Sequence, residues 1–176
     1  MSDILDIAII GSGPAGLSAA GRAAARNMRY ILLEKTDHLS DTIYKYQKGK
    51  HVMATPVQLE LRSDVDFDAG KRETILGRWD EQATPFNVAR NADITAIAGA
   101  KGDFTITAAD GREWHAAHVI LAIGTQGNPN RMRCPGADMP HIQYQLDDPT
   151  EYIDEHITVV GSGDAGIENA LGLAAD

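Results

Sequence analysis

The alternation of apolar and polar positions along the chain predicts the start of an α/β fold. Residues 4–10 form a short apolar run typical of a buried strand, and the glycine turn GSGPAG follows at 11–16. The Ala-rich segment 15–27 has no strong breaker before its last residue and is expected to be helical, while YILLE at 30–34 reads as a second buried strand. A strand, a helix and a strand in this order predict parallel strands joined by a right-handed crossover.

A second helix is predicted in the middle of the chain. The segment FDAGKRETILGRWDEQ, residues 67–82, has apolar residues at helical spacing, and either of two preceding acids is in position to cap it. The apolar face would be formed by Ile75, Leu76 and Trp79, and the candidate caps are Asp66 and Asp68.

From residue 91 the apolar period changes from helical to strand-like. Short β-type runs occur at 93–98, 103–109 and 112–116, and Asp110-Gly111 between the last two is a strong hairpin signal. These runs predict a small antiparallel β-meander. A fully apolar strand, HVILAIGT at 118–125, follows it as a separate element, and the turn-rich segment after it is typical of a linker.

The chain contains an internal repeat. IAIIGSGPAG at 7–16 and ITVVGSGDAG at 157–166 are offset by 150 residues, and each is a strand, a glycine turn and a helix start. The repeat predicts two nucleotide-binding units: a first domain at 1–127, a linker at 128–155, and the first strand and helix of a second domain at 156–176. The strand at 156–160 would have no sheet neighbours of its own, so it is expected to dock elsewhere, to pair between chains or to be disordered.

The composition of the chain restricts the classes of molecule that it is expected to bind. The chain has 176 residues, 43% of them apolar and 23% charged, which is ordinary for a globular protein. A net charge of −9 argues against nucleic-acid and anionic-membrane partners, because phosphate contacts need clustered Lys and Arg. The acidic start lacks the features of a secretory signal, and the apolar runs are too short for a membrane span. The single cysteine, Cys134, excludes an internal disulfide and favours a cytoplasmic setting.

The first glycine turn is suited to a dinucleotide. Backbone N–H groups at a helix start have no partner within the helix and lie at the positive end of its dipole, so a pyrophosphate fits there. Gly11 permits the tight turn, Gly13 leaves room for the pyrophosphate, and Gly16 lets the helix pack closely on the strand. The acid expected about 20 residues further on is Glu34, whose carboxylate can accept hydrogen bonds from ribose hydroxyls. No metal site is expected, and no catalytic side chain can be named from the sequence.

With both glycine motifs and VILAIGT at 119–125, the chain resembles flavoprotein reductases of the pyridine nucleotide–disulfide oxidoreductase superfamily, on its thioredoxin-reductase-like side. The resemblance spans essentially the whole chain, although Ile123 stands in the middle of the family's ATG position. It implies a Rossmann-like parallel sheet that binds FAD, followed by a second Rossmann unit that binds NAD(P)H. The electron acceptor would be a small molecule or a small redox protein, and a homodimer is left open.

The resemblance also implies the contacts of FAD. The residues expected at the pyrophosphate are Gly11, Ser12, Gly13, Ala15 and Gly16. Glu34 would hold the adenosine ribose with Lys35 beside it. Ile94, expected on the strand after the predicted helix, would meet adenine through its backbone. Gly124 and Thr125 would lie near the cofactor at the exit of the apolar strand.

The second motif carries the implied contacts of NAD(P)H. The residues expected at its pyrophosphate are Gly161, Ser162, Gly163, Asp164, Ala165 and Gly166. Glu168 matches the family's acid in the first helical turn, close to the nicotinamide end. Acids at a helix start are also favoured for the helix alone, so this reading competes with a purely structural one.

The disulfide reductases of the superfamily need a redox-active cysteine pair, and both of its usual slots, residues 35–50 and 143–155, lack cysteine here. The chain is therefore more similar to relatives without the CxxC, namely the thioredoxin-reductase-like ferredoxin–NADP reductases and the bacillithiol-disulfide-reductase-like proteins. DTIYKYQ at 41–47 is similar to a segment of the latter group, which implies that Tyr44 and Tyr46 lie near the flavin.

These observations predict an FAD-dependent NAD(P)H oxidoreductase, of which this chain would be an N-terminal piece with weak or no FAD retention and no turnover of its own. Two alternatives stay open: an enzyme like the flavin-containing monooxygenases, and a non-catalytic adenine-nucleotide-binding module.

Overall fold

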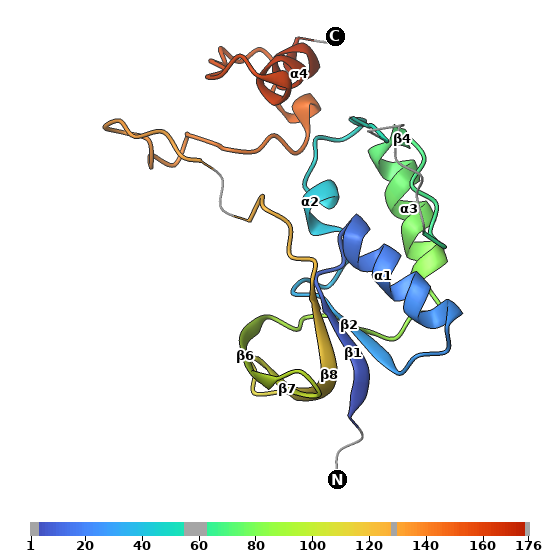
Figure 1. Cartoon of the computed structure of the whole chain (residues 1–176). Helices are drawn as coiled ribbons and strands as arrows, with labels where there is room; N and C mark the ends of the chain where they lie inside the picture. Colours follow the sequence, from blue (N-terminus) through green and yellow to red (C-terminus); the bar gives the residue numbers. More distant parts are fainter. Residues whose placement is uncertain (1–3, 55–62, 128–129, 175–176) are drawn as a thin grey trace.

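The computed structural model describes residues 4–54, 63–127 and 130–174. Its centre is a six-stranded sheet with the order β5-β2-β1-β8-β7-β6 (Figure 1). The parallel strands are β1 (Leu5–Ile10), β2 (Tyr30–Leu33), β5 (Val88–Ala89) and the second half of β8 (Glu113–Leu121). The strands β7 (Asp103–Ala108) and β6 (Ile94–Ala100) extend the same sheet in antiparallel fashion. The predicted α/β fold with a parallel sheet and an antiparallel meander is confirmed.

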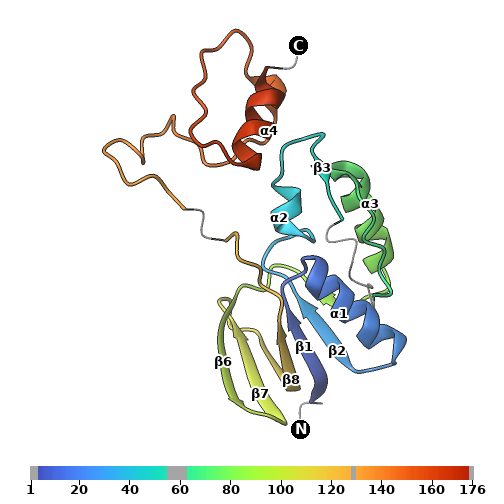
Figure 2. The same ribbon diagram turned by 45° about the horizontal axis from the view of Figure 1, so that its top comes forward.

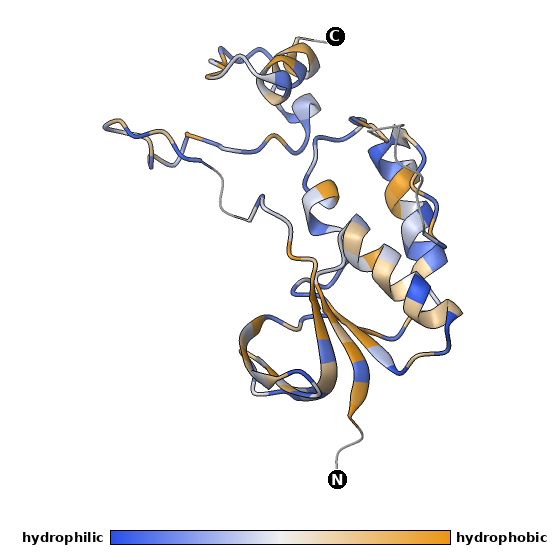
Figure 3. Cartoon of the chain, viewed as in Figure 1, coloured by the Kyte–Doolittle hydropathy of each residue, from blue (hydrophilic) through white to orange (hydrophobic). Residues whose placement is uncertain are grey.

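Side chains alternate along the central strands and divide the core into two layers. Ile9 and Leu32 belong to the layer that contains α1 (Pro14–Ala25) and α3 (Arg72–Ala83). Ala8 and Leu33 belong to the other layer, together with buried residues of β7 and β8. Both views place α1 and α3 on one side of the sheet and the β6–β7 hairpin on the other (Figure 2). The central strands are correspondingly apolar over most of their length (Figure 3).

The helix predicted at 67–82 begins further along the chain than expected, at Arg72, and is α3. Neither Asp66 nor Asp68 caps it. Its N-cap is Lys71, because residues before it pair as strands: β4 (Gly70–Lys71) runs antiparallel to β3 (His51–Val52). Asp66 instead accepts hydrogen bonds from the backbone of Asp68 and the guanidinium of Arg78. The predicted apolar face is confirmed, with Ile75 and Trp79 buried and Leu76 packed against them.

The two strands predicted at 112–116 and 118–125 are a single strand, β8, so that prediction is wrong. Its first half pairs antiparallel with β7, and its second half pairs parallel with β1. One long strand therefore joins the meander to the parallel sheet. Several short elements were not predicted: the strands β3, β4 and β5, the 3-10 turn η1 (Pro149–Glu151) and the four-residue helix α2 (Asp41–Tyr44).

The strand predicted at 156–160 is not formed. These residues have no strand hydrogen bonding and are exposed, Val160 to 70%. A strand depends on a neighbouring strand for its hydrogen bonds, and no described strand lies beside this segment. The helix after it does form, as α4 (Asp164–Leu173), preceded by the 3-10 turn η1 (Pro149–Glu151). The domain boundaries at 127 and 155 stay a prediction.

Across the three described ranges, no helix is both long enough and apolar enough to cross a bilayer.

Candidate cofactor-binding site

The first glycine turn lies between the carboxyl end of β1 and the start of α1, and its shape depends on glycine. Gly11 has φ +98°, and a Cβ on it would lie closer than 3.0 Å to the backbone carbonyl of Ala122 after β8. A Cβ on Gly16 would lie even closer to the carbonyl oxygen of Gly11. These two glycines therefore let strand, turn and helix pack together.

Gly13 has a different role. It is the N-cap of α1 with extended backbone angles that any residue can adopt, and Pro14 follows at the first helical position. Outside the adjoining turn, no described atom lies within 4 Å of the position that a Cβ on Gly13 would take. The backbone is therefore bare and open at the helix start, where unpaired N–H groups favour an anion.

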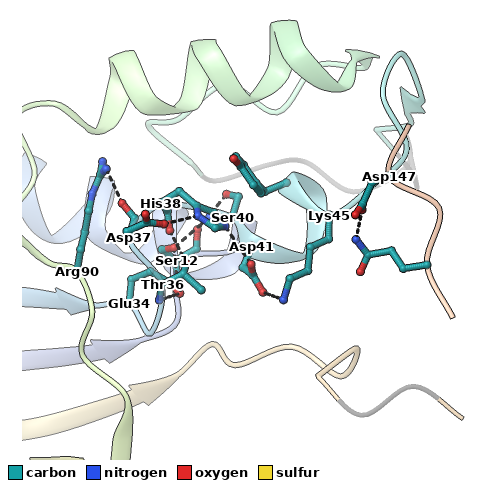
Figure 4. Close-up of polar contacts among 12 residues, drawn as sticks. Ser12, Glu34, Thr36, Asp37, His38, Ser40, Asp41, Lys45, Arg90 and Asp147 are labelled. Carbon is teal, nitrogen blue, oxygen red and sulfur yellow. Dashed lines mark hydrogen bonds and ion pairs between the residues drawn. The ribbon is translucent and has the colours of Figure 1, made fainter. Parts of the chain in front are cut away.

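Glu34 directly follows β2 and is only 6% exposed. One carboxylate oxygen, Oε2, accepts hydrogen bonds from the amide of Ser12 at 2.9 Å and from its hydroxyl at 2.5 Å. The other oxygen, Oε1, accepts from the amide of Thr36 at 2.9 Å and lies 3.1 Å from its hydroxyl oxygen (Figure 4). The carboxylate is thus held against the glycine turn and away from bulk solvent.

Ser40 connects the glycine turn to α2. Its amide donates to the Ser12 hydroxyl at 3.1 Å, and its own hydroxyl donates to the Ser12 carbonyl at 3.0 Å. Ser40 is 1% exposed and has φ +57°, an uncommon backbone conformation for a residue with a side chain. Asp41 follows it, and burial alone would raise the pKa of this carboxyl. Hydrogen bonds from Lys45 and His38 outweigh that effect and hold the pKa below its usual range.

The structure brings most of the predicted FAD contacts together. Gly11, Ser12, Gly13, Ala15, Gly16 and Glu34 meet at the carboxyl ends of β1 and β2, and Gly124 and Thr125 follow β8 on the same edge of the sheet. Lys35 is next in sequence to Glu34, but its ammonium group is 3.1 Å from Asp93 and its side chain is 70% exposed.

Ile94 lies on a strand, as predicted, but that strand is not the first one after α3. The strand after α3 is β5, whereas Ile94 begins β6 and pairs with Ala108. Two other residues lie beside the backbone of Glu34: its amide donates to the carbonyl of Ala89 at 3.0 Å, and its carbonyl accepts from the amide of Ala92 at 2.7 Å. Sequence reasoning missed this segment because β5 has only two residues and no measurable period.

The second glycine turn repeats the local geometry of the first. Gly161 has φ +121°, Gly163 is an extended N-cap with open space at its Cβ position, and a Cβ on Gly166 would collide with the Gly161 carbonyl. The residues expected at NAD(P)H are mostly exposed, and Asp164 begins α4. Glu168 forms an ion pair with Lys50, at 2.6 Å between Oε2 and Nζ.

A cavity of about 770 Å³ lies between the segment after α2, the exit of β8, the 130–146 segment and α4. Its lining includes Asp41, Tyr46, Gln47, Thr125 and Ala165. Within the described residues, the buried Oε1 of Gln47 has no hydrogen-bond partner. The two tyrosines expected near the flavin lie in different surroundings. Tyr46 lines the cavity, whereas the ring of Tyr44 stacks on His38 at 3.7 Å.

The sequence profile of the pyridine nucleotide-disulphide oxidoreductase family matches residues 8–176. The chain belongs to this family. The predicted resemblance to this family is therefore confirmed.

Named relatives in the family agree with this assignment. The chain is 31% identical to a ferredoxin–NADP reductase of Lactiplantibacillus plantarum, over 98% of this chain and 51% of the relative. It is 28% identical to a thioredoxin reductase of Peptoclostridium acidaminophilum, over 99% of this chain and 52% of the relative. The chain thus spans about half the length of the curated relatives it matches.

Solved structures show the same fold. The bacillithiol disulfide reductase Bdr of Staphylococcus aureus superimposes with a TM-score of 0.84 at 23% identity, covering 98% of this chain and 54% of that one. A flavin monooxygenase of Stenotrophomonas maltophilia superimposes with a TM-score of 0.71 at 20% identity, covering 99% of this chain and 55% of that one.

Proposed function

We propose that this chain forms the adenine-nucleotide half of the FAD site in an NAD(P)H-dependent flavoprotein oxidoreductase. The observation that carries the proposal is the bare backbone at Gly13 next to the buried carboxylate of Glu34. A diphosphate and a ribose diol need these two features side by side.

The residues present fit the adenosine diphosphate part of the cofactor. Amides at the start of α1 would hold the pyrophosphate, where Gly13 leaves the approach open. The carboxylate of Glu34 would accept hydrogen bonds from the ribose hydroxyls, which would replace the Ser12 hydroxyl as a donor. When bound, the flavin supplies hydride and electron transfer, and the residues of this chain bind and orient it.

The second glycine turn is proposed to hold the NAD(P)H pyrophosphate through residues 161–166. Its backbone geometry supports this, because Gly161 has a positive φ like Gly11, Gly163 is an extended N-cap like Gly13, and Gly166 packs on Gly161 as Gly16 packs on Gly11. Glu168 would lie toward the nicotinamide end only after it leaves Lys50.

The electron acceptor is proposed to be a small molecule or a small redox protein. Its reduction would not use a CxxC pair from residues 35–50 or 143–155. The lack of cysteine in both segments supports this, as does a relative named for ferredoxin. The exposed lone thiol of Cys134 supports a reducing, cytoplasmic setting. A homodimer stays a proposal for the whole protein.

Binding of FAD and ADP to the purified chain tests the cofactor site. Gly13→Ala keeps an allowed backbone and open space in the free protein, yet puts a methyl group where the pyrophosphate would approach. We expect affinity to fall about fivefold or more, since such a clash is worth about 1–3 kcal/mol. Gly77→Ala on α3, also with open space at its Cβ position, is the matched control and should leave binding unchanged.

Equal binding by both variants would overturn the proposed site. Anaerobic bleaching of flavin absorbance by NADH or NADPH, in a full-length protein that contains this segment, tests the oxidoreductase activity. Binding of ADP without any retention of flavin in that protein would support the non-catalytic module instead.

A further inference from the structure

We propose that His38 is a positioning residue whose protonated ring holds the loop that fixes both Glu34 and Ser12 in the cofactor site. The inference rests on the proposed adenine-nucleotide function for its effect on binding, but its effect on the loop exists in the free protein.

The ring of His38 lies between two carboxylates on either side of a tight turn. Its Nδ1 is 2.7 Å from Oδ1 of Asp37, and its Nε2 is 2.9 Å from Oδ1 of Asp41 (Figure 4). The side chain is 26% exposed and its ring stacks on Tyr44. Both ring nitrogens therefore have a hydrogen-bonding partner, one in the loop after β2 and the other in α2.

The protonation state decides whether both contacts are favourable. An imidazolium carries two N–H donors and satisfies both carboxylates, whereas a neutral imidazole has one donor and one lone pair. The lone pair would then face a carboxylate oxygen. One of the two contacts of this clamp, which His38 forms with Asp37 and Asp41, would be lost. Histidine is the side chain whose charge commonly changes near neutral pH.

The loop that this clamp closes carries the contacts of the cofactor site. The amide of Thr36 donates to Glu34, and its hydroxyl oxygen is also 2.8 Å from the carbonyl oxygen of His38. Ser40, at the other end of the loop, exchanges two hydrogen bonds with Ser12. Release of either carboxylate from His38 would therefore loosen the groups that orient the Glu34 carboxylate and the glycine turn.

Other charged groups around His38 hold its partners in place or lie near its ring. Lys45, directly after α2, pairs with the second oxygen of Asp41 at 2.7 Å. Arg90, on the segment after β5, donates to the Asp37 carbonyl at 3.0 Å and pairs with Asp80 of α3. Arg72 of α3 lies over the Tyr44 ring that His38 stacks on. Glu34, reached through Thr36, adds a further negative charge on the side of the sheet.

The first test needs no ligand. Hydrogen-exchange protection of the Thr36 and Ser40 amides should fall severalfold between about pH 5.5 and about pH 8 in the wild-type chain, after correction for intrinsic exchange. In His38→Gln the protection should be low and independent of pH. His38→Arg, a permanent cation that can stack on Tyr44, should restore the protection at high pH. Two results would overturn the inference. One is hydrogen-exchange protection of these amides that does not change with pH in the wild-type chain, and the other is protection in His38→Gln equal to that of the wild type.

The second test measures ADP affinity over the same pH range. We expect the wild-type affinity to weaken about three- to tenfold as pH rises, in line with the loss of one charge-assisted hydrogen bond. His38→Gln should bind weakly at every pH, and His38→Arg should bind well at every pH. His118→Gln, on β8 near Asp6 at the other end of the sheet, is the control and should follow the wild type.

Asp37→Ala separates positioning from simple attraction between a cation and a diphosphate. It removes a negative charge, so an attraction acting alone predicts tighter ADP binding, whereas a broken clamp predicts weaker binding. Tighter binding by Asp37→Ala would therefore contradict the positioning role. If the wild-type chain binds no ADP at all, the proposed cofactor site fails, while the exchange test still decides whether His38 holds the loop.

Discussion

A single carboxylate oxygen of Glu34 accepts hydrogen bonds from both the amide and the hydroxyl of Ser12, 22 residues earlier in the chain. This pair joins the ends of β1 and β2 at the edge where the glycine turn opens. Because both groups are almost completely buried, the geometry of the turn and the position of the acid are coupled.

Replacement of Glu34 by Gln should reduce both stability and ADP binding. One acceptor oxygen becomes an NH₂ donor that faces the donors of either Ser12 or Thr36, and a buried unsatisfied donor costs about 1–3 kcal/mol. Urea unfolding measures the first effect and calorimetric titration with ADP the second. Glu113→Gln, on an exposed position of β8, is the control and should change neither. Full ADP affinity in Glu34→Gln would contradict the ribose role.

Gly16→Ala should be much more destabilising than Gly77→Ala, although both glycines are helical. A methyl group at position 16 overlaps the Gly11 carbonyl, which belongs to the backbone and cannot turn aside. We expect a loss of about 3 kcal/mol, whereas Ala at the open position 77 should stabilise the helix by about 0.5–1 kcal/mol. Urea unfolding of the two variants measures this difference in the free energy of unfolding, provided that both transitions have the same dependence on urea concentration.

Asp148 should keep its charge to unusually low pH. The hydrogen bond from Lys48 at 2.5 Å, followed by those from Thr150, lowers the pKa of Asp148 from 3.8 to about 2. A lowered pKa means that this contact stabilises the folded chain above about pH 4 and is lost as pH falls toward 2. NMR titration of the Asp148 carboxyl should show the shift, and Lys48→Ala should move the pKa back up. Lys101→Ala, in the turn between β6 and β7, should leave it unchanged.

The sequence predicted the parts of the site that depend on local pattern. The order of strand, glycine turn, helix and acid lies within 30 residues, and each glycine has a steric reason that can be stated without a structure. Gly161 and Gly166 support this view, because their turn takes the shape of the first one although no strand precedes it. A glycine turn at a helix start is therefore largely a local structure.

The elements that were missed depend on contacts between distant segments. The two residues of β5 form a strand only because β2 offers them hydrogen bonds, and β8 is continuous because two different partners bind its two halves. The clamp around His38 was invisible for a similar reason. Its three residues are close in sequence, but only the turn geometry brings both carboxylates to one ring.

The ion pair between Lys50 and Glu168 is expected to hold α4 in place. This helix has ten residues, none of them buried, and isolated helices shorter than about 12–15 residues are marginal in water. Lys50 is only 19% exposed and also lies 4.8 Å from the ring centre of Tyr46, so its side chain joins α4 to the cavity wall. In Lys50→Ala, amide exchange across 164–173 should therefore become about two- to fivefold faster, as expected for the loss of a partly exposed ion pair. Exchange in β1 and β8 should stay the same, because their hydrogen bonds lie within the sheet. If α4 exchanges at the wild-type rate in this variant, the position of the helix depends on contacts other than this ion pair.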